Sequence, residues 1–188
     1  PPIPGLDNTD YLTYETVWDL EELPRRLIVV GAGPIGCELA QAFCRLGSSV
    51  TLLEGAPRIM LQDEPEAAEL LSQHLVRDGV DLRLNAMVQR VRQSSDGIHV
   101  IVGDEEILGD ALLMSVGRTP NVAGLELDKA GVAYTPKGIQ VNNRLRTTQR
   151  RIHAAGDCAG GYQFTHYAGW QGFMAVRNAF MPKFATAK

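Results

Sequence analysis

The clearest hydrophobic pattern begins at residue 27 and consists of short apolar runs at regular intervals. Leu27–Val30 and Val50–Leu53 are continuous apolar runs, bounded by polar residues or glycine. Such runs are typical of parallel strands that are buried on both faces. Val80–Leu84 alternates apolar and polar residues and is expected to be a third strand.

Between these runs the apolar positions take helical spacing. Residues 35–46 form the first such stretch, and Gly47 follows its end. Residues 64–77 form the second, with Asp63 as the expected N-cap and Gly79 past the end. The order strand, helix, strand, helix, strand predicts a doubly wound parallel sheet with helices on both faces.

The pattern changes after residue 84. Short strand-like runs separated by turns predict an antiparallel β-meander inserted after the third strand, and a further buried strand follows it. The three runs of the meander are residues 88–92, 98–102 and 105–108, and the buried strand is 111–116.

From residue 121 the pattern loosens. Val132, Ile139 and Val141 lie in short extended pieces, Ile152–Ala155 is expected to be a strand, and Tyr167–Phe180 is apolar at helical spacing. We therefore divide the chain into a lead-in segment (1–24), a Rossmann-type α/β domain (25–120) and a third part (121–188) with few local partners.

One motif carries chemistry. Gly31, Gly33 and Gly36 form a G-x-G-x-x-G between the first strand and the first helix, and Glu54 ends the second strand 18 residues later. This setting is that of a dinucleotide-binding loop, where the glycines permit a tight turn, close approach of a pyrophosphate and close packing of the helix. The alternative is a close-packed turn that binds no ligand.

The acid at the second strand favours NAD over NADP. Glu54 is expected to accept hydrogen bonds from the adenosine ribose, and its charge would repel a 2′-phosphate. Arg58 is either a phosphate-binding group that weakens this preference or a solvated loop residue. Glu38 is either an ordinary acid in the first helical turns or a group beside the nicotinamide.

Composition excludes several classes of protein. The chain has 188 residues, a formal net charge of −4 and 45% hydrophobic residues. These values are typical of a folded globular chain and not of a nucleic-acid binder. No apolar run is long enough for a membrane helix, and no leader is visible, so we expect a cytoplasmic protein without a membrane partner.

The remaining candidate groups give no site. Cys37 and Cys44 lie two helical turns apart, too far for a disulfide, and the four histidines have no metal-ligand spacing. We therefore expect no metal site and no catalytic triad. The arginines at 144, 146, 150 and 151 are expected to be a solvated stretch rather than an anion site.

Together three motifs resemble the flavoprotein (pyridine nucleotide-) disulfide reductases, in particular their dihydrolipoamide dehydrogenase and mercuric-reductase-like members. The motifs are Gly31–Glu54, then Ser115–Asn121 with its Gly-Arg-Thr-Pro-Asn, and then Thr147–Asp157 ending in Ile-His-Ala-Ala-Gly-Asp. Their order along nearly the whole chain makes the resemblance specific to the group, although not to one substrate.

The resemblance implies a role for each matching residue. It places Glu38 beside the nicotinamide and flavin rings, Val88 at the adenine and Gly117 near the nicotinamide. Pro34 stands where some relatives carry an aromatic gate over the flavin. The implied NAD loop is Gly31, Gly33, Pro34, Ile35 and Gly36 with Glu54, and the implied FAD contacts are Asp157, Gln163, Phe164, Thr165 and His166.

The resemblance also implies parts that this chain does not contain. The family's flavin fingerprint and redox cysteine pair lie upstream of this region, and an interface domain with a catalytic histidine and glutamate lies downstream. We therefore expect an NAD(H)-binding domain with a partial FAD-domain segment, from a parent flavoprotein that is a homodimer. The chain alone should bind NAD(H) without turnover.

Two other functions remain open at this point. A stand-alone NAD-binding or sensing module is disfavoured because it has no need of the second turn at Gly156-Asp157. An NADH oxidase or a ferredoxin-reductase-like flavoprotein differs only in parts outside this chain. We also expect exposed apolar surface along Tyr167–Phe180, with partial disorder there or packing against another copy.

Overall fold

In the computed structural model, which describes residues 2–181, the chain divides into two compact units. The first unit is residues 1–117 and the second is residues 118–188. The predicted assignment of 25–120 and 121–188 to an NAD-binding domain and an FAD-domain segment stays a prediction.

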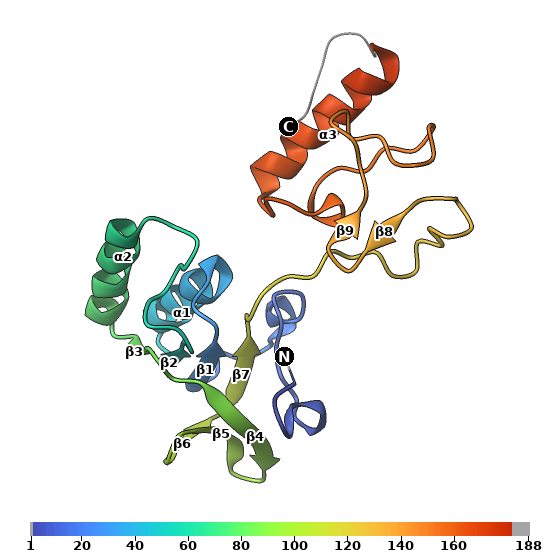
Figure 1. The fold of residues 1–188 in the computed structure, drawn as a ribbon. Coiled ribbons are helices and arrows are strands. Elements are labelled where there is room, and N and C mark those ends of the chain that lie inside the picture. The colour runs from blue at the N-terminus through green and yellow to red at the C-terminus, as the bar shows by residue number, and fades with distance from the viewer. Residues whose placement is uncertain (1, 182–188) are drawn as a thin grey trace. The chain divides into compact units, whose positions relative to one another are not determined.

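The first unit is built on a four-stranded parallel sheet with the order β3-β2-β1-β7 (Figure 1). The predicted parallel sheet is therefore confirmed. Its strands are β1 (Arg26–Val30), β2 (Ser49–Leu53), β3 (Asp81–Arg83) and β7 (Ala111–Met114), and its helices are α1 (Pro34–Leu46) and α2 (Pro65–Asp78).

The two faces of this sheet have different partners. Leu27 and Val29 pack in the core cluster that includes residues of α1 and α2, whereas Ile28 and Val30 pack in the cluster that includes residues of an antiparallel sheet. Figure 1 shows the two helices and that antiparallel sheet as separate parts around the parallel strands. The prediction of helices on both faces is wrong in this detail, because both helices share one face. The meander buries the opposite face, so no helix is needed there.

That meander has the predicted position and order. Its strands are β4 (Val88–Ser94), β5 (Gly97–Val102) and β6 (Glu105–Gly109), which pair antiparallel in sequence order. Val91, Ile98 and Val100 are buried against the parallel sheet. One face of the meander is therefore part of the core, which is common for antiparallel sheets.

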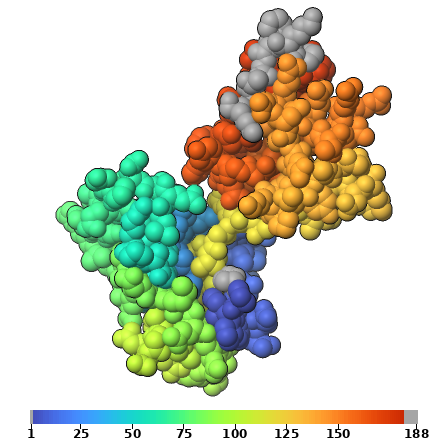
Figure 2. Space-filling model, in the orientation of Figure 1, coloured from blue at the N-terminus to red at the C-terminus, as the bar shows by residue number. Residues whose placement is uncertain are grey.

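The first 24 residues pack on this unit. The N–H of Leu12 donates to the carbonyl of Leu112 (2.7 Å), and the N–H of Met114 donates to Leu12 (2.8 Å), which extends the sheet beyond β7. The short 3₁₀ helices η1 (Leu6–Asn8) and η2 (Val17–Asp19) each bury one residue. Figure 2 shows the blue N-terminal residues against the green meander, where Val91 donates to the carbonyl of Pro4.

Both helices end at the glycines that the sequence predicted, but the expected N-cap of α2 is wrong. Gly47 and Gly79 adopt the left-handed conformation (φ 113° and 104°) just past α1 and α2. The N-cap of α2 is Glu64 instead of Asp63, and no side chain caps it. Pro65 at the first helical position fixes this start, since its ring already has a helical φ.

The second unit has less regular structure. It contains a two-stranded hairpin of β8 (Tyr134–Thr135) and β9 (Gly138–Ile139), then η3 (Asp157–Ala159) and α3 (Thr165–Phe180). The predicted strand at 152–155 is wrong, because only one bridge forms there, between Arg146 and His153. A continuous strand needs a ladder of partners, and this segment pairs only across its own turn.

The expected apolar surface along α3 is present. Trp170, Phe173, Val176 and Phe180 are all exposed, and Phe180 is 83% exposed. The same residues lie in α3, and the expected partial disorder or packing against another copy stays a prediction. Among the described residues, no helix is long and apolar enough to cross a membrane.

Candidate functional site

The glycine motif lies at the carboxyl ends of β1 and β7, where the strand order reverses. β2 and β3 lie on one side of β1 and β7 lies on the other. In open α/β sheets ligands bind in the crevice at such a switch point. Gly31 (φ 99°) leaves β1 here, and its N–H donates to the carbonyl of Leu53 (2.8 Å).

Gly36 is required by packing within the protein. A Cβ on Gly36 would lie 1.9 Å from the carbonyl oxygen of Gly31 and 2.7 Å from Oγ of Ser115. The Ser115 hydroxyl donates at this place to the carbonyls of Val30 (2.9 Å) and Gly31 (2.7 Å). The start of α1 is therefore pressed against the ends of two strands.

Gly33 is different, because the protein does not require a glycine there. Its φ of −75° is open to any residue, and no described atom lies within 4 Å of the place where its Cβ would be. Gly33 is the N-cap of α1, and the first helical hydrogen bond runs from Cys37 to its carbonyl (3.0 Å). The N–H groups before that bond have no partner within the helix and can bind an anion.

Glu54 is hydrogen-bonded to the backbone of the glycine motif. Its Oε2 accepts from the N–H of Ala32 (2.8 Å), inside the glycine motif, and its Oε1 accepts from the N–H of Ala56 (2.9 Å). Each carboxylate oxygen has a second lone pair free for a ribose hydroxyl. Glu54 thus has a structural role that the sequence did not reveal.

Arg58 is half-buried, and its guanidinium is hydrogen-bonded to the loop that contains it. Its guanidinium donates to the carbonyls of Met60 (2.7 Å) and Leu61 (2.8 Å), with longer bonds to Ile59 and Asp63. These bonds fix the loop between β2 and α2. Of the two alternatives, Arg58 is a loop residue, but its terminal N–H groups donate to carbonyls of the same loop, so a phosphate would have to compete with these bonds.

The other predicted residues of α1 lie on its exposed side. Pro34 and Glu38 are exposed and Ile35 is half-buried. Between them, Cys37 is buried and its thiol lies 3.4 Å from the carbonyl of Ala32. Burial, together with the charges of Glu54 and Glu38, raises the pKa of Cys37 to about 12, so its thiol stays protonated.

Val88 and Gly117 have contrasting surroundings. Val88 is buried in the core under the meander, which gives it a packing role, and its predicted contact with adenine stays a prediction. Gly117 has a left-handed φ of 104° and no described atom near the place of a Cβ. It follows Ser115 and Val116, which contact Gly31, so the backbone is open on this side of the crevice too.

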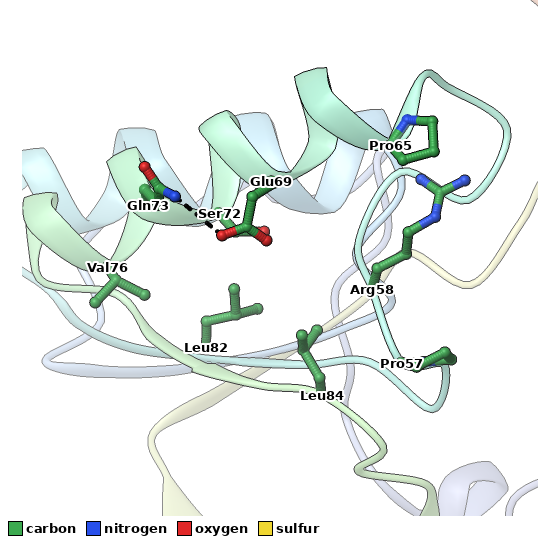
Figure 3. Close-up of a pocket in the computed structure, with 9 residues that line it drawn as sticks. All are labelled: Pro57, Arg58, Pro65, Glu69, Ser72, Gln73, Val76, Leu82 and Leu84. Atoms are coloured by element: carbon green, nitrogen blue, oxygen red, sulfur yellow. Dashed lines mark hydrogen bonds between the residues drawn. The ribbon is translucent and has the colours of Figure 1, made fainter.

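A cavity of about 520 Å³ lies elsewhere in this unit, between α2 and β3 (Figure 3). Its polar groups already have partners, since Gln73 donates to Glu69 and Ser72 donates to the carbonyl of Ala68. Of the candidate nucleotide contacts only Arg58 lines it, and neither the glycine motif nor Glu54 does, so it is not the predicted nucleotide crevice. The lining residues are Pro57, Arg58, Pro65, Glu69, Ser72, Gln73, Val76, Leu82 and Leu84.

The residues predicted to contact flavin gather in the second unit. Nη1 of Arg118 donates to the carbonyl of Gln163 (2.6 Å) and lies 3.7 Å from Oδ2 of Asp157. Phe164 and His166 stack with ring centroids 5.5 Å apart, and Thr165 begins α3. Asp157 and the segment 163–166 are thus brought together, and their contact with flavin stays a prediction.

Two residues in this arrangement were not predicted. Arg118 joins Asp157 to Gln163, and its signal was its place after Gly117 in the Gly-Arg-Thr-Pro-Asn motif. Gln171 is buried in α3, and its Oε1 accepts from the N–H of Gly156 (2.8 Å), which fixes the turn before Asp157. Nothing in the sequence pattern distinguishes Gln171 from a surface residue.

Comparison with known proteins gives one family. The family model described as pyridine nucleotide-disulphide oxidoreductase matches residues 1–172. The chain is 41% identical over 184 residues to a mercuric reductase of Bacillus cereus, covering 95% of this chain and 29% of that protein. It is 38% identical over 176 residues to a dihydrolipoyl dehydrogenase of Bacillus subtilis, covering 93% and 37%.

Solved structures agree with these relatives. The HOCl-induced flavoprotein disulfide reductase RclA of Escherichia coli superposes with a TM-score of 0.91 at 34% identity, covering all of this chain and 43% of that one. A water-forming NADH oxidase of Lactobacillus brevis, bound to NADH, gives 0.82 at 26% identity, covering 98% and 44%. The chain thus spans less than half the length of these relatives.

Proposed function

Because the chain belongs to the pyridine nucleotide-disulphide oxidoreductase family, whose members here are flavoprotein oxidoreductases, we propose that its first unit binds NAD(H). The observation that carries this proposal is Gly33. Its backbone is unstrained and no described atom lies near the place of a Cβ, so neither strain nor packing within the described residues accounts for the glycine, whereas a bound pyrophosphate would. The pyrophosphate of the dinucleotide would lie against Gly33 and the first N–H groups of α1.

The residues on either side of Gly33 define where the two halves of the dinucleotide would lie. Glu54 accepts from the adenosine ribose with its remaining lone pairs while it holds Ala32 and Ala56. The nicotinamide end lies toward Gly117 and the exposed Glu38. Val88, Pro34 and Ile35 complete the proposed contacts.

NADH is the proposed substrate in preference to NADPH. The 2′-phosphate of NADPH would meet the Glu54 carboxylate, which repels it. Arg58 does not compensate, since its guanidinium donates to the carbonyls of residues 59–63. The proposed preference for NADH therefore depends on the charge of Glu54 and on the hydrogen bonds that keep Arg58 within its own loop.

The second unit supplies part of an FAD site in the intact parent. Asp157 and residues 163–166 would contact the flavin, held in place by Arg118 and Gln171. The chemistry that the bound cofactors supply is hydride transfer from NADH to FAD and reduction of a disulfide or similar acceptor. This chain binds and orients, while the redox disulfide, the catalytic base and the dimer interface belong to the parent's other parts.

Two alternatives remain in the proposal. The likeness to a water-forming NADH oxidase favours an oxidase or ferredoxin-reductase-like parent as the second candidate. A stand-alone NAD sensor in the cytoplasm is less favoured, because the arrangement of Arg118, Asp157 and Gln163 has no role in it.

Titration of the chain with NADH and with NADPH, followed by nicotinamide fluorescence, tests the proposal. We expect NADH to bind about tenfold more tightly or better. Glu54→Gln removes the charge and should narrow the ratio, whereas Glu66→Gln, a matched exposed acid in α2, should not. Binding of neither nucleotide, or an unchanged ratio in Glu54→Gln, would contradict the proposal.

A further inference from the structure

A second cavity, of about 370 Å³, lies in the second unit beside the last turns of α3. The turn between residues 144 and 153 forms one wall and the end of the helix forms the other. The lining residues are Arg144, Arg146, Arg150, Arg151, His153, Asn178 and Ala179. The arginines expected to be a solvated stretch therefore share one concave surface.

The positive charge of this cavity is not compensated. Within residues 2–181 no carboxylate lines it, and arginine stays protonated at any ordinary pH. Among residues 2–181, none of its four guanidinium groups makes an ion pair or a side-chain hydrogen bond. Elsewhere in the chain Arg26, Arg45 and Arg83 each pair with a carboxylate at 2.9 Å or less. Four unpaired arginines in one cavity point to an anionic ligand.

Asn178 adds an independent requirement. It is 4% exposed, and its Nδ2 donates to the carbonyl of Arg144 (3.1 Å). Its Oδ1 is buried and has no hydrogen-bond partner, the one such side-chain atom found in the described part of the chain. A buried acceptor without a donor is costly. A ligand for this cavity should therefore carry a hydrogen-bond donor next to its negative charge.

The end of α3 does not account for the arginines. A helix C-terminus is equivalent to about half a negative elementary charge, which offsets only a small part of four guanidinium groups. The cavity is also separate from the proposed flavin contacts. Asn178 lies 13 residues after Thr165 on the same helix, which is about 20 Å along its axis.

We propose that the cavity formed by Arg144, Arg146, Arg150, Arg151, His153 and Asn178 binds a hydrogen phosphate group. The guanidinium groups match phosphate oxygens in charge and geometry. The P–O–H of the same group donates to Oδ1 of Asn178, which supplies the missing partner. This site is independent of the NAD(H) site in the first unit.

Calorimetric titration of the 188-residue chain with inorganic phosphate and with sulfate, near neutral pH and at equal ionic strength, tests the proposal. The two anions have similar size, but sulfate carries no proton to donate. We expect phosphate to bind about fivefold more tightly or better. Equal affinities, or no phosphate binding, would overturn the proposal.

Variants locate the site. Arg144→Gln with Arg146→Gln should weaken phosphate binding about tenfold or more. If that double variant does not fold, Arg150→Gln with Arg151→Gln, at exposed positions, tests the same site and should weaken phosphate binding in the same way. Arg77→Gln with Arg90→Gln removes the same charge from exposed positions in the first unit and should leave binding within about twofold. Full phosphate affinity in both cavity variants would overturn the proposal.

Two further measurements separate this site from the nucleotide site and identify the phosphate's source. NADH affinity should be unchanged in the cavity variants, so loss of NADH binding and loss of phosphate binding are distinct results. Adenosine monophosphate, titrated beside inorganic phosphate at about pH 5.5, is the third probe, because its phosphate then still carries the proton that the site requires. Tighter binding than inorganic phosphate assigns the cavity to a nucleotide phosphate, and weaker binding assigns it to the free ion.

Discussion

Gly33 and Gly36 belong to one motif but are glycines for different physical reasons. Gly36 has no room for a side chain, because its Cβ would lie 1.9 Å from the carbonyl oxygen of Gly31. Gly33 has ample room and an ordinary backbone. Gly36 is thus required for folding, whereas in the proposed function Gly33 is required for nucleotide binding.

Substitution of each glycine should separate these effects. Gly33→Val should cost less than about 1 kcal/mol of stability, through a poorer N-cap residue, and weaken NADH binding about tenfold or more, because its side chain would occupy the pyrophosphate position. Gly36→Ala should lower stability by at least about 1–3 kcal/mol through overpacking. Thermal unfolding and NADH titration of both variants check this. A destabilised Gly33→Val with normal NADH affinity would contradict the assignment.

At this scale the sequence predicted which residues gather, but not how they are bonded. Spacing and position were enough to place Gly31, Gly33 and Glu54 at one sheet edge, because the carboxyl ends of parallel strands share that edge. The bonds of Arg58 to carbonyls and the unpaired Oδ1 of Asn178 depend on side-chain positions set by the fold. No sequence pattern marks either of them.

Among the elements, the β4–β5 hairpin has a carboxylate that fixes its turn. Oδ1 of Asp96 accepts from the Ser94 hydroxyl (2.6 Å) and lies 3.1 Å from Nε2 of the buried His99. The hydrogen bonds from Ser94 and then His99 lower the pKa of Asp96 from 3.8 to about 2. The ionised form is therefore preferred in the folded hairpin.

This shift gives a pH dependence of known sign. The folded-state pKa of Asp96 is below its unfolded value, so its contribution is complete above about pH 4 and is lost as the pH falls toward 2. Asp96→Asn should therefore lose less stability than the unmodified chain between about pH 5 and about pH 2. Melting temperatures across this range measure it, with Asp104→Asn in the next turn as control. Parallel pH profiles for all three proteins would contradict it.

The elements that the sequence predicted well are those whose pattern reflects local burial. β1, β2, α1 and α2 all lie within a residue or two of their expected bounds. The strand expected at 152–155 did not form, because a strand also needs neighbours that its own pattern does not specify. The shared face of α1 and α2 was missed because it depends on strand order: the crossovers from β1 to β2 and from β2 to β3 run in the same direction, and right-handed crossovers then place both helices on one face.

For the whole molecule, the apolar side of α3 is the largest departure from an ordinary surface. Trp170, Phe173, Val176 and Phe180 recur at helical spacing and are exposed together. Such a face marks an interaction surface in a folded chain. In the isolated chain a second copy is a ready partner for it.

We expect the chain to associate as its concentration rises. Phe173→Glu with Val176→Lys should shift its mass in sedimentation equilibrium toward the 20.5 kDa of one chain. Leu46→Glu, which changes an exposed apolar residue at the end of α1, should not. If the unmodified protein has the mass of one chain at every concentration, self-association through the apolar side of α3 is ruled out.

The place of β7 in the sheet has a consequence for how the chain acquires its fold during synthesis. β7 is a neighbour of β1, yet the second strand, both helices, β3 and the whole meander lie between them in sequence. The sheet therefore stays open on that side of β1 until residue 114 has left the ribosome, and the pairing of Leu12 with β7 must wait for the same residues. Because contacts so distant in sequence form slowly, this closure should set the folding rate of the first unit.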